Sequence, residues 1–318
     1  MKKKNILVTG GSGFIGTNLL KKLSSNSNYN LFSNYYSNNK FKRINNVEYS
    51  YADLENLDEC KKICKNKDII IMCAANSSGA AVMDKTPLVH LSPNIRMNVN
   101  MAEAAYELGV KKFIFISSNT VYPNVDYPVK EIHASFEFFE KYHVVGWMKR
   151  FSEIVMQIYS EKIKDNKMTT IIIRPGNLYG PYDKFDPEKS KVIPSLIRKV
   201  VERQNPLIVW GDGSDLKDFL YIDDFTDALV KVIENVKDFH ELNIASGKGQ
   251  TINEILDIIL KIENAKDLTI NFDKSMPTMI PKRLIDISKA ENILNFEPKI
   301  SIEEGLRKTI DWYKSYDN

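Results

Sequence analysis

The stretch that decides the fold is LVTGGSGFIG, residues 7–16. An apolar, strand-like run passes into a glycine-rich turn and then into GTNLLKKLSS (16–25), which has the pattern of a helix. Glycines let the backbone approach a pyrophosphate, and the free N–H groups of the following helix attract its charge. A plain glycine-rich turn would look similar by itself, but the flanking strand and helix favour a dinucleotide-binding loop. Its residues would be Gly10, Gly13, Phe14, Ile15 and Gly16.

Strand-like and helix-like segments alternate through the first two thirds of the chain. Nearly continuous apolar runs, such as DIIIMCAA (68–75) and KKFIFISS (111–118), are typical of strands covered on both faces. The alternation predicts an α/β fold, a Rossmann-type doubly wound parallel sheet with right-handed βαβ units. The expected strands occupy residues 5–10, 29–35, 47–53, 68–75, 111–118, 169–176 and 239–246.

The chain becomes less regular from about Pro181, where prolines interrupt it more often. We therefore expect a dinucleotide-binding Rossmann domain over residues 1–180, with returning segments around 205–245. Residues 181–318 are expected to form mainly a smaller C-terminal α/β lobe that binds the substrate.

The composition is that of an ordinary globular enzyme and argues against several other classes. Of 318 residues, 43% are hydrophobic and 27% are charged, and the net charge is +3 with both signs interspersed. This pattern indicates no nucleic-acid partner, and the lack of an apolar run of ~18 residues indicates no membrane span. Cys60, Cys64 and Cys73 lack the His or Cys neighbours of a metal site, so we expect reduced thiols, no bound metal and a cytoplasmic protein.

Two features stand where an adenine and its ribose would need them. Asp53, at the end of a predicted strand and followed by Leu54, could accept from an adenine amino group, although it could equally cap a helix. The segment CAAN (73–76) ends a buried strand with the small residues Ala74 and Ala75, which leaves room for a cofactor against the backbone.

The end of the second predicted strand bears on the choice between NAD and NADP. NAD-binding folds usually place an acid there to hold the ribose hydroxyls. In LFSNYYSNNKFKR (31–43) the corresponding residue is Asn34, and Lys40, Lys42 and Arg43 follow. A 2′-phosphate would meet cations and no acid, so NADP(H) is favoured over NAD(H), with Arg43 as the expected contact; the alternative is a solvated basic loop.

Four longer segments resemble the extended short-chain dehydrogenase/reductase family, the NAD(P)-dependent nucleotide-sugar epimerases, dehydratases and reductases. Residues 177–199, NLYGPYDKFDPEKSKVIPSLIRK, are most similar to the GDP-L-fucose synthases, which epimerise and reduce GDP-4-keto-6-deoxymannose. The resemblance covers nearly the whole chain. The segments are NIRMNVNMAEAAYELGVKKFIFISSNTVYP (94–123), RPGNLYGPYD (174–183), VWGDGSDLKDFLYIDDFTDAL (209–229) and PKRLIDISKAENILNFEPKISIEEGLRKTIDWY (281–313).

The resemblance implies a catalytic set with one member replaced. Ser118 matches the serine that hydrogen-bonds the reacting sugar oxygen, and Lys149 matches the lysine of the family's Y-x-x-x-K pair. That lysine binds the nicotinamide ribose and lowers the pKa of the tyrosine, which exchanges the proton. The tyrosine position is occupied by Val145, which cannot exchange a proton. Further cofactor contacts implied by the resemblance are Pro175, Asn177 and Leu178.

Further positions differ from the related enzymes and limit the reactions that this chain can catalyse. The fucose synthases epimerise C3 and C5 with a cysteine and a histidine, whose positions match Thr120 and Lys191. The 4,6-dehydratases carry an Asp-Glu pair where this chain has Asn119 and Thr120, while a hydroxyl at position 120 resembles the 4-epimerases. Hydride transfer at one carbinol, C4, is the chemistry that remains.

The proton for this transfer needs another source. Tyr142 lies three residues before Val145 and is the first candidate, although it could also be a surface or dimer-interface residue. Lys191 is the second, with phosphate binding as its alternative role. A water molecule held by Ser118 and Thr120 is the third, and His143 is a weaker candidate.

The resemblance also implies substrate contacts and a dimer. The two-fold four-helix bundle of the family predicts a homodimer with Trp147 or Met148 near its seam. Three functions compete: an NADP-dependent reductase of a 4-keto sugar linked to GDP, a C4 epimerase of a nucleotide sugar, and a non-catalytic protein that binds the cofactor or sugar nucleotide. The expected substrate-binding residues are Asn119, Asn177, Lys191, Lys199, Trp210 and Lys217.

Overall fold

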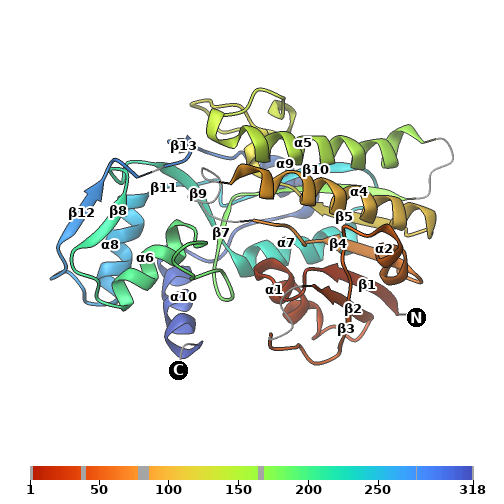
Figure 1. Cartoon of the computed structure of the whole chain (residues 1–318), viewed down its shortest axis with the longest axis horizontal. Helices are drawn as coiled ribbons and strands as arrows, with labels where there is room; N and C mark the ends of the chain where they lie inside the picture. The colour runs from red at the N-terminus through yellow and green to blue at the C-terminus, as the bar shows by residue number, and fades with distance from the viewer. Residues whose placement is uncertain (1–2, 37–40, 78–85, 164–167, 277, 317–318) are drawn as a thin grey trace.

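A seven-stranded parallel sheet forms the centre of the computed structural model, which describes residues 3–36, 41–77, 86–163, 168–276 and 278–316. The strand order is β10-β6-β5-β4-β1-β2-β3 (Figure 1). This is the doubly wound, Rossmann-type sheet that the sequence predicts, and that prediction is confirmed. The strands are β1 (Lys4–Thr9), β2 (Tyr29–Tyr35), β3 (Val47–Tyr51), β4 (Ile69–Met72), β5 (Lys112–Ile116), β6 (Thr169–Pro175) and β10 (His240–Ile244).

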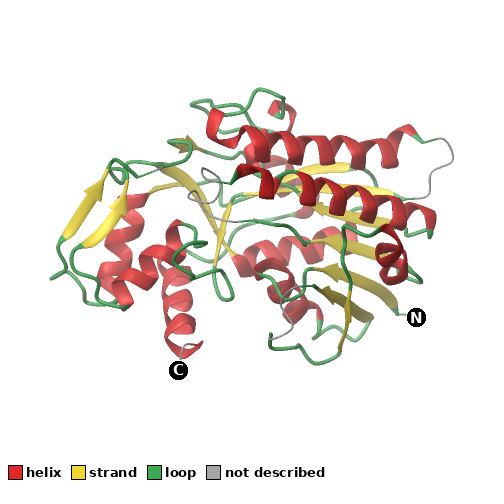
Figure 2. Cartoon of the chain, in the orientation of Figure 1, coloured by secondary structure: helices red, strands yellow, loops and turns green. Residues whose placement is uncertain are grey.

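Helices cover both faces of this sheet because its side chains alternate between two apolar layers (Figure 2). In β5, Phe113 and Phe115 join the layer under one set of helices, while Ile114 and Ile116 join the other layer. On the Phe115 side lie α2 (Leu57–Cys64), α4 (Ser92–Glu107) and α5 (His143–Gln157). On the Ile114 side lie α1 (Phe14–Leu23) and α7 (Ile222–Asn235).

The remaining elements form two smaller sheets with their own helices, to the left in Figure 1. Strand β9 pairs with β11, β13 and β7, and β12 pairs with β8. The strands are β7 (Asn177–Tyr179), β8 (Leu207–Trp210), β9 (Leu216–Tyr221), β11 (Gly249–Thr251), β12 (Ile270–Asp273) and β13 (Lys282–Arg283). Their helices are α6 (Val192–Val201), α8 (Ile252–Ile262) and α10 (Ile302–Tyr316), whereas α9 (Ser288–Leu294) packs on β10 and α7 of the large sheet (Figure 1).

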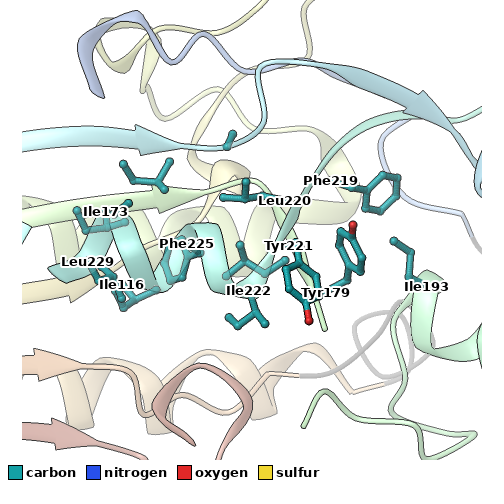
Figure 3. Close-up of a cluster of buried hydrophobic side chains, with 14 of the residues drawn as sticks. Ile116, Ile173, Tyr179, Ile193, Phe219, Leu220, Tyr221, Ile222, Phe225 and Leu229 are labelled. Carbon is teal, nitrogen blue, oxygen red and sulfur yellow. The ribbon is translucent and has the colours of Figure 1, made fainter. Parts of the chain in front are cut away.

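One apolar cluster runs from the large sheet into the smaller part of the molecule. Figure 3 shows Phe225 and Leu229 of α7 beside Ile173, and, further along, Tyr179 and Tyr221, whose ring centres lie 5.6 Å apart. The continuity of this core holds the smaller sheets against the carboxyl ends of the parallel strands, where ligands bind in open α/β sheets.

Short helical turns complete the connections. The turns η1 (Pro87–His90), η2 (Asn119–Val121), η3 (Glu131–His133) and η4 (Glu140–Tyr142) lie between the longer elements, and η5 (Ile158–Lys162) extends α5. Among the described residues, no helix combines the length and apolarity needed to cross a membrane.

Candidate active site

The glycine loop between β1 and α1 leaves no room for side chains. A Cβ at Gly16 would lie 2.3 Å from the Gly10 carbonyl oxygen, and one at Gly10 would lie 2.9 Å from Ala74 Cα. Gly10 also has φ +67°, which favours glycine, and the Gly13 N–H donates to its carbonyl oxygen at 2.9 Å. The loop therefore folds tightly against the end of β4 and leaves its outer backbone open to a phosphate.

Asn34 ties the glycine loop to the ends of β2 and β3. Its Oδ1 accepts from the Gly10 N–H at 3.0 Å, and its Nδ2 donates to the Ala52 carbonyl at 3.2 Å. The residue is only 2% exposed. At this position the chain uses a neutral amide to join three backbone segments, where an NAD-binding fold usually presents a carboxylate to the ribose.

Arg43, the expected contact for a 2′-phosphate, lies over two aromatic rings next to this segment. Its guanidinium carbon lies 5.6 Å from the ring centre of Tyr35 and 5.7 Å from that of Tyr49. Lys42 is exposed beside it, and Lys40 lies outside the described residues. The cation–π contacts hold the Arg43 cation at the carboxyl ends of β2 and β3.

Asp53 follows β3 and does not cap a helix. Asn56 caps α2, accepting from the N–H groups of Asp58 and Glu59, so the capping alternative for Asp53 is wrong. The Asp53 carboxylate accepts from the Glu55 N–H at 2.9 Å, which closes a turn at the edge of the expected adenine site. Of the neighbouring residues expected to touch the cofactor, Leu54 is buried, Ala74 is half-buried and Ala75 is exposed.

Ser118 and Thr120 form a hydroxyl pair just beyond β5. The Ser118 Oγ accepts from the Thr120 N–H at 3.2 Å and from the Thr120 Oγ1 at 3.0 Å. Between them, the Asn119 side chain donates to the Pro175 carbonyl at 3.0 Å, which joins this turn to the end of β6. Two of the expected catalytic residues are therefore in direct contact at the carboxyl edge of the sheet.

The start of α5 packs directly on this turn. A Cβ at Gly146 would lie 2.8 Å from the Thr120 carbonyl oxygen and 2.7 Å from the Phe138 ring. Val145, the residue before it, is half-buried. The close approach needs glycine at position 146 and brings position 145 into the neighbourhood of Ser118.

Lys149 follows Val145 by about one helical turn. Its Nζ donates to the Ile116 carbonyl oxygen at 2.8 Å and lies 4.9 Å from the centre of the Phe115 ring. Burial lowers the pKa of this amine to about 8, although the Glu153 carboxylate acts in the opposite direction. The buried amine thus ends at the edge of the sheet that carries Ser118.

Tyr142 and Lys191, the first two candidate proton donors, lie in different surroundings. The Tyr142 hydroxyl accepts from the Ile280 N–H, and burial raises its pKa to about 12. Lys191 precedes α6, and its Nζ lies 6.0 Å from the ring centre of Phe14 in the glycine loop. His143, the weaker candidate, is exposed at the start of α5.

Asp183, which the sequence analysis did not single out, lies beside Lys191. It is 8% exposed, and its Oδ2 has no hydrogen-bond partner within the described residues. Burial raises the pKa of the carboxyl, and the nearby Lys191 acts against that. Its place in the segment GPYD (180–183), eight residues before Lys191, offered no sign that Lys191 would influence it electrostatically.

Of the expected substrate residues, Lys199 lies on α6, and Asn177, Trp210 and Lys217 lie on strands of the smaller sheets. Several of their polar groups already bind other residues of the chain. Lys199 donates to the Ile208 carbonyl at 2.7 Å, and Lys217 pairs with Asp215 at 2.9 Å. Asn177, in β7, donates to the Asp218 carbonyl at 2.9 Å. Trp210 is half-buried at the end of β8, and Leu178 is buried in β7. Asn119 lies between Ser118 and Thr120, and its contact with Pro175 brings that turn to the segment that leads into Asn177.

Comparisons with known proteins agree on the family. The model of the NAD dependent epimerase/dehydratase family matches residues 6–245. GDP-L-fucose synthase 1 of Arabidopsis thaliana is 29% identical over 320 residues, covering 98% of this chain and 94% of that protein. The crystal structure of UDP-glucose 4-epimerase from Thermotoga maritima with UDP-glucose is 25% identical, with a TM-score of 0.88 over 99% of this chain and 100% of that one.

A second solved structure carries the cofactor. UDP-glucuronic acid 4-epimerase from Bacillus cereus, in complex with UDP-glucuronic acid and NAD, is 27% identical, with a TM-score of 0.86 over 98% of this chain and 99% of that one. The likenesses span both the large sheet and the smaller ones, and they confirm the family resemblance noted in the sequence. The chain belongs to the NAD dependent epimerase/dehydratase family and is an NAD(P)-dependent enzyme.

Proposed function

We propose that this enzyme reduces a 4-keto sugar linked to GDP. The observation that carries the proposal is the pair Ser118 and Thr120 beside the buried Lys149, at the same edge of the sheet as the glycine loop. The names of relatives such as GDP-L-fucose synthase support a GDP-linked substrate.

The residues at this edge suit hydride transfer to a carbonyl carbon. A bound nicotinamide cofactor would supply the hydride, with the glycine loop holding its pyrophosphate. The Ser118 hydroxyl, oriented by Thr120, would donate to the sugar oxygen as negative charge develops on it. Lys149, which the resemblance places at the nicotinamide ribose, would keep a cation nearby.

Epimerisation at C3 and C5 is not part of the proposal. The cysteine and histidine that perform it in the fucose synthases are replaced by Thr120 and Lys191. A threonine hydroxyl is too weak an acid to serve in the cysteine's place. Lys191, near Phe14 and Asp183, could instead bind an anionic or carbonyl group of the substrate.

A C4 epimerase is the second candidate. Two solved structures of the same fold, at 25% and 27% identity, are 4-epimerases of UDP-sugars. Such a reaction would oxidise and then reduce C4 with retained cofactor, so it would consume no added NADPH.

For the cofactor, we propose NADP(H) over NAD(H). Arg43 is held at the ends of β2 and β3 by Tyr35 and Tyr49, and Asn34 puts no negative charge near a 2′-phosphate. Arginine is suited to phosphate because its planar guanidinium donates two parallel hydrogen bonds.

We also propose that the enzyme is a homodimer joined through α4 and α5. Trp147 is 43% exposed on α5 and stacks on Phe151, with ring centres 6.1 Å apart, while Met148 is buried within the subunit. Replacing Trp147 with glutamate would place a charge in the centre of the interface and should give a monomer in sedimentation at micromolar concentration. Phe272→Glu, on the distant β12, is the matched control and should leave the dimer intact. A wild-type monomer would refute the proposed dimer.

The experiment that tests the proposed function uses GDP-4-keto-6-deoxymannose as the probe. The purified enzyme is mixed with it and NADPH, and the loss of NADPH fluorescence and the sugar product are followed. A reductase consumes NADPH and yields the C4 alcohol. Consumption of no NADPH, together with interconversion of UDP-glucose and UDP-galactose, would favour the epimerase instead.

A further inference from the structure

Reduction of a sugar ketone needs an acid that protonates the sugar oxygen. The resemblance assigns proton donation to a tyrosine at position 145, and this chain has a valine there. We propose that the ammonium group of Lys149 is itself the acid that protonates the sugar oxygen, directly or across one water molecule. This inference rests on the proposed function, because it names the acid of that reaction.

The first support is the placement of the amine. Lys149 Nζ donates to the carbonyl oxygen of Ile116, the last residue of β5, at 2.8 Å, and Ser118 follows two residues later. Positions four apart share one face of a helix, so Val145 lies on the face of α5 that carries Lys149. An ammonium group has three protons, and within the described part of the chain the hydrogen bond to Ile116 uses one of them.

The second support is the state of Glu153, the nearest carboxylate to the amine along α5. Glu153 is fully buried and accepts from Ser117 Oγ at 2.5 Å and from Arg174 Nε at 2.8 Å. Arg150 donates to it as well, at 2.9 Å. Both arginines also pair with Glu241, at 3.5 and 2.6 Å, so these two arginines and two carboxylates together carry no net charge beside Lys149.

The third support is that the other neighbours of the Lys149 amine carry no charge. The amine is packed against the Phe115 ring, and the nearby Cys73 is a neutral thiol, because burial raises its pKa to about 12. Burial in this setting lowers the pKa of Lys149 to about 8, even with Glu153 raising it. An acid with a pKa near the working pH both carries its proton and releases it, as general acid catalysis requires.

The step balances without any further reagent. Bound NADPH would supply a hydride to the carbonyl carbon and become NADP⁺, the C=O π bond would break with its electron pair going to oxygen, and that oxygen would take one proton from the Lys149 ammonium. Lys149 is left as a neutral amine and regains a proton from solvent before the next turnover. Ser118 keeps its own proton and acts as a hydrogen-bond donor throughout.

The other candidate donors are less suited to this step. Burial raises the pKa of the Tyr142 hydroxyl to about 12, so it releases a proton less readily than the Lys149 ammonium. Lys191 lies by Phe14 and Asp183 rather than on the face of α5 that carries position 145.

The test compares Lys149→Arg with Tyr142→Phe, using GDP-4-keto-6-deoxymannose and NADPH. Arginine keeps the positive charge but does not release a proton. Lys149→Arg should lower kcat by ~10²–10⁴-fold and Tyr142→Phe by less than about threefold. In Lys149→Ala, added ethylamine should restore part of kcat without changing the KM for NADPH. A large loss in Tyr142→Phe, or amine effects confined to the KM for NADPH, would overturn the proposal.

Lys112 provides the matched control. It begins the same strand that ends at Ile116, and its Nζ donates to the Val232 and Ile233 carbonyls at 3.2 and 2.7 Å. Burial lowers its pKa to about 8 as well. Lys112→Arg should leave kcat and its pH profile unchanged, because this amine lies at the amino end of β5, and Ser118 follows the carboxyl end.

The pH profile of the wild type adds a second readout. Because the acid must be protonated, kcat should be level at low pH and fall as the pH rises through about 8. This falling limb should disappear in Lys149→Arg. Persistence of the same limb in the variant would contradict the proposal.

A final measurement separates this inference from the proposed function, since it needs no substrate. The pKa of Lys149 is lowered from 10.5 to about 8 in the folded protein, so between these values the unfolded chain binds more protons. The free energy of unfolding should therefore rise with pH across that window, and it should rise less steeply in Lys149→Met. Equal slopes in both proteins would show an unshifted amine and overturn the inference; inactivity with the probe but unequal slopes would refute only the proposed substrate.

Discussion

The glycine loop and the start of α5 lie at the same edge of the sheet, but they are specified in opposite ways. In the loop, Gly10 and Gly16 are needed because a side chain would strike the neighbouring backbone. At the start of α5, Gly146 is needed for the same reason, because a Cβ there would strike the Thr120 carbonyl. The backbone sets no such limit on the side chain of the neighbouring Val145. The comparison teaches that a phosphate site built from backbone N–H groups would depend on the fold alone, whereas proton delivery depends on single side chains.

Of the variants that test this difference between the two regions, Ser118→Ala should have the largest effect on kcat. Ser118→Ala removes the hydrogen bond to the developing oxyanion and should lower kcat by ~10²–10³-fold. The affinity for NADPH should change little, because the glycine loop, which we propose holds the pyrophosphate, follows β1 and not β5. Steady-state kinetics and a fluorescence titration of NADPH check the two halves of this expectation.

Thr120→Val is the companion to this variant. It removes the hydroxyl that donates to the Ser118 Oγ at 3.0 Å and keeps the shape of the side chain. We expect kcat to fall, but by less than in Ser118→Ala. If Ser118→Ala kept full turnover, the hydroxyl pair would have no place in the chemistry.

A smaller effect, and on binding instead of turnover, is expected at Gly16. In Gly16→Ala the new Cβ would lie 2.3 Å from the Gly10 carbonyl oxygen, so the loop must shift. Overpacking of this kind costs ~1–3 kcal/mol, and NADPH affinity should fall by ~10–100-fold. Isothermal titration calorimetry measures the change.

Gly109→Ala is the control for the glycine effect. Gly109 has φ +71°, but a Cβ there would meet no atom within 4 Å. This variant should lose stability from backbone strain and keep its affinity for NADPH. Equal losses of affinity in both variants would show that the loop is not the cofactor site.

The smallest effect is expected at Arg43. Arg43→Ala should weaken NADPH binding by about tenfold, close to 1.4 kcal/mol, and NADH binding by much less, because only NADPH carries a 2′-phosphate. Lys42→Ala, at the exposed neighbouring residue, should have a weaker effect on both. A wild type that binds NADH more tightly than NADPH would refute the proposed cofactor preference.

The sequence allowed the large sheet to be predicted almost completely. The expected strand at 29–35 coincides with β2, and the runs at 68–75 and 111–118 contain β4 and β5. Buried parallel strands are predictable because both faces are apolar, so the signal is a continuous run.

The side-chain arrangement at the edge of the sheet was predictable only in part. The pairing of Ser118 with Thr120 follows from their spacing in one turn, and the absence of tyrosine at position 145 is visible directly. The role of Asn34 in joining three backbone segments and the surroundings of Lys149 depend on residues distant in the chain. Pattern and propensity carry no information on such contacts.

The central claim is that this chain transfers hydride although Val145 replaces the usual tyrosine. The most direct measurement is a single turnover with GDP-4-keto-6-deoxymannose and NADPH that carries deuterium at both C4 positions of the nicotinamide ring. The sugar product of the wild type and of Val145→Tyr is then analysed by mass spectrometry. The account predicts that the wild type places deuterium at C4 of the product, and that the tyrosine variant does so with an altered pH profile. No deuterium in the product of the wild type, with transfer by Val145→Tyr, would contradict the account and identify the natural chain as a binding protein.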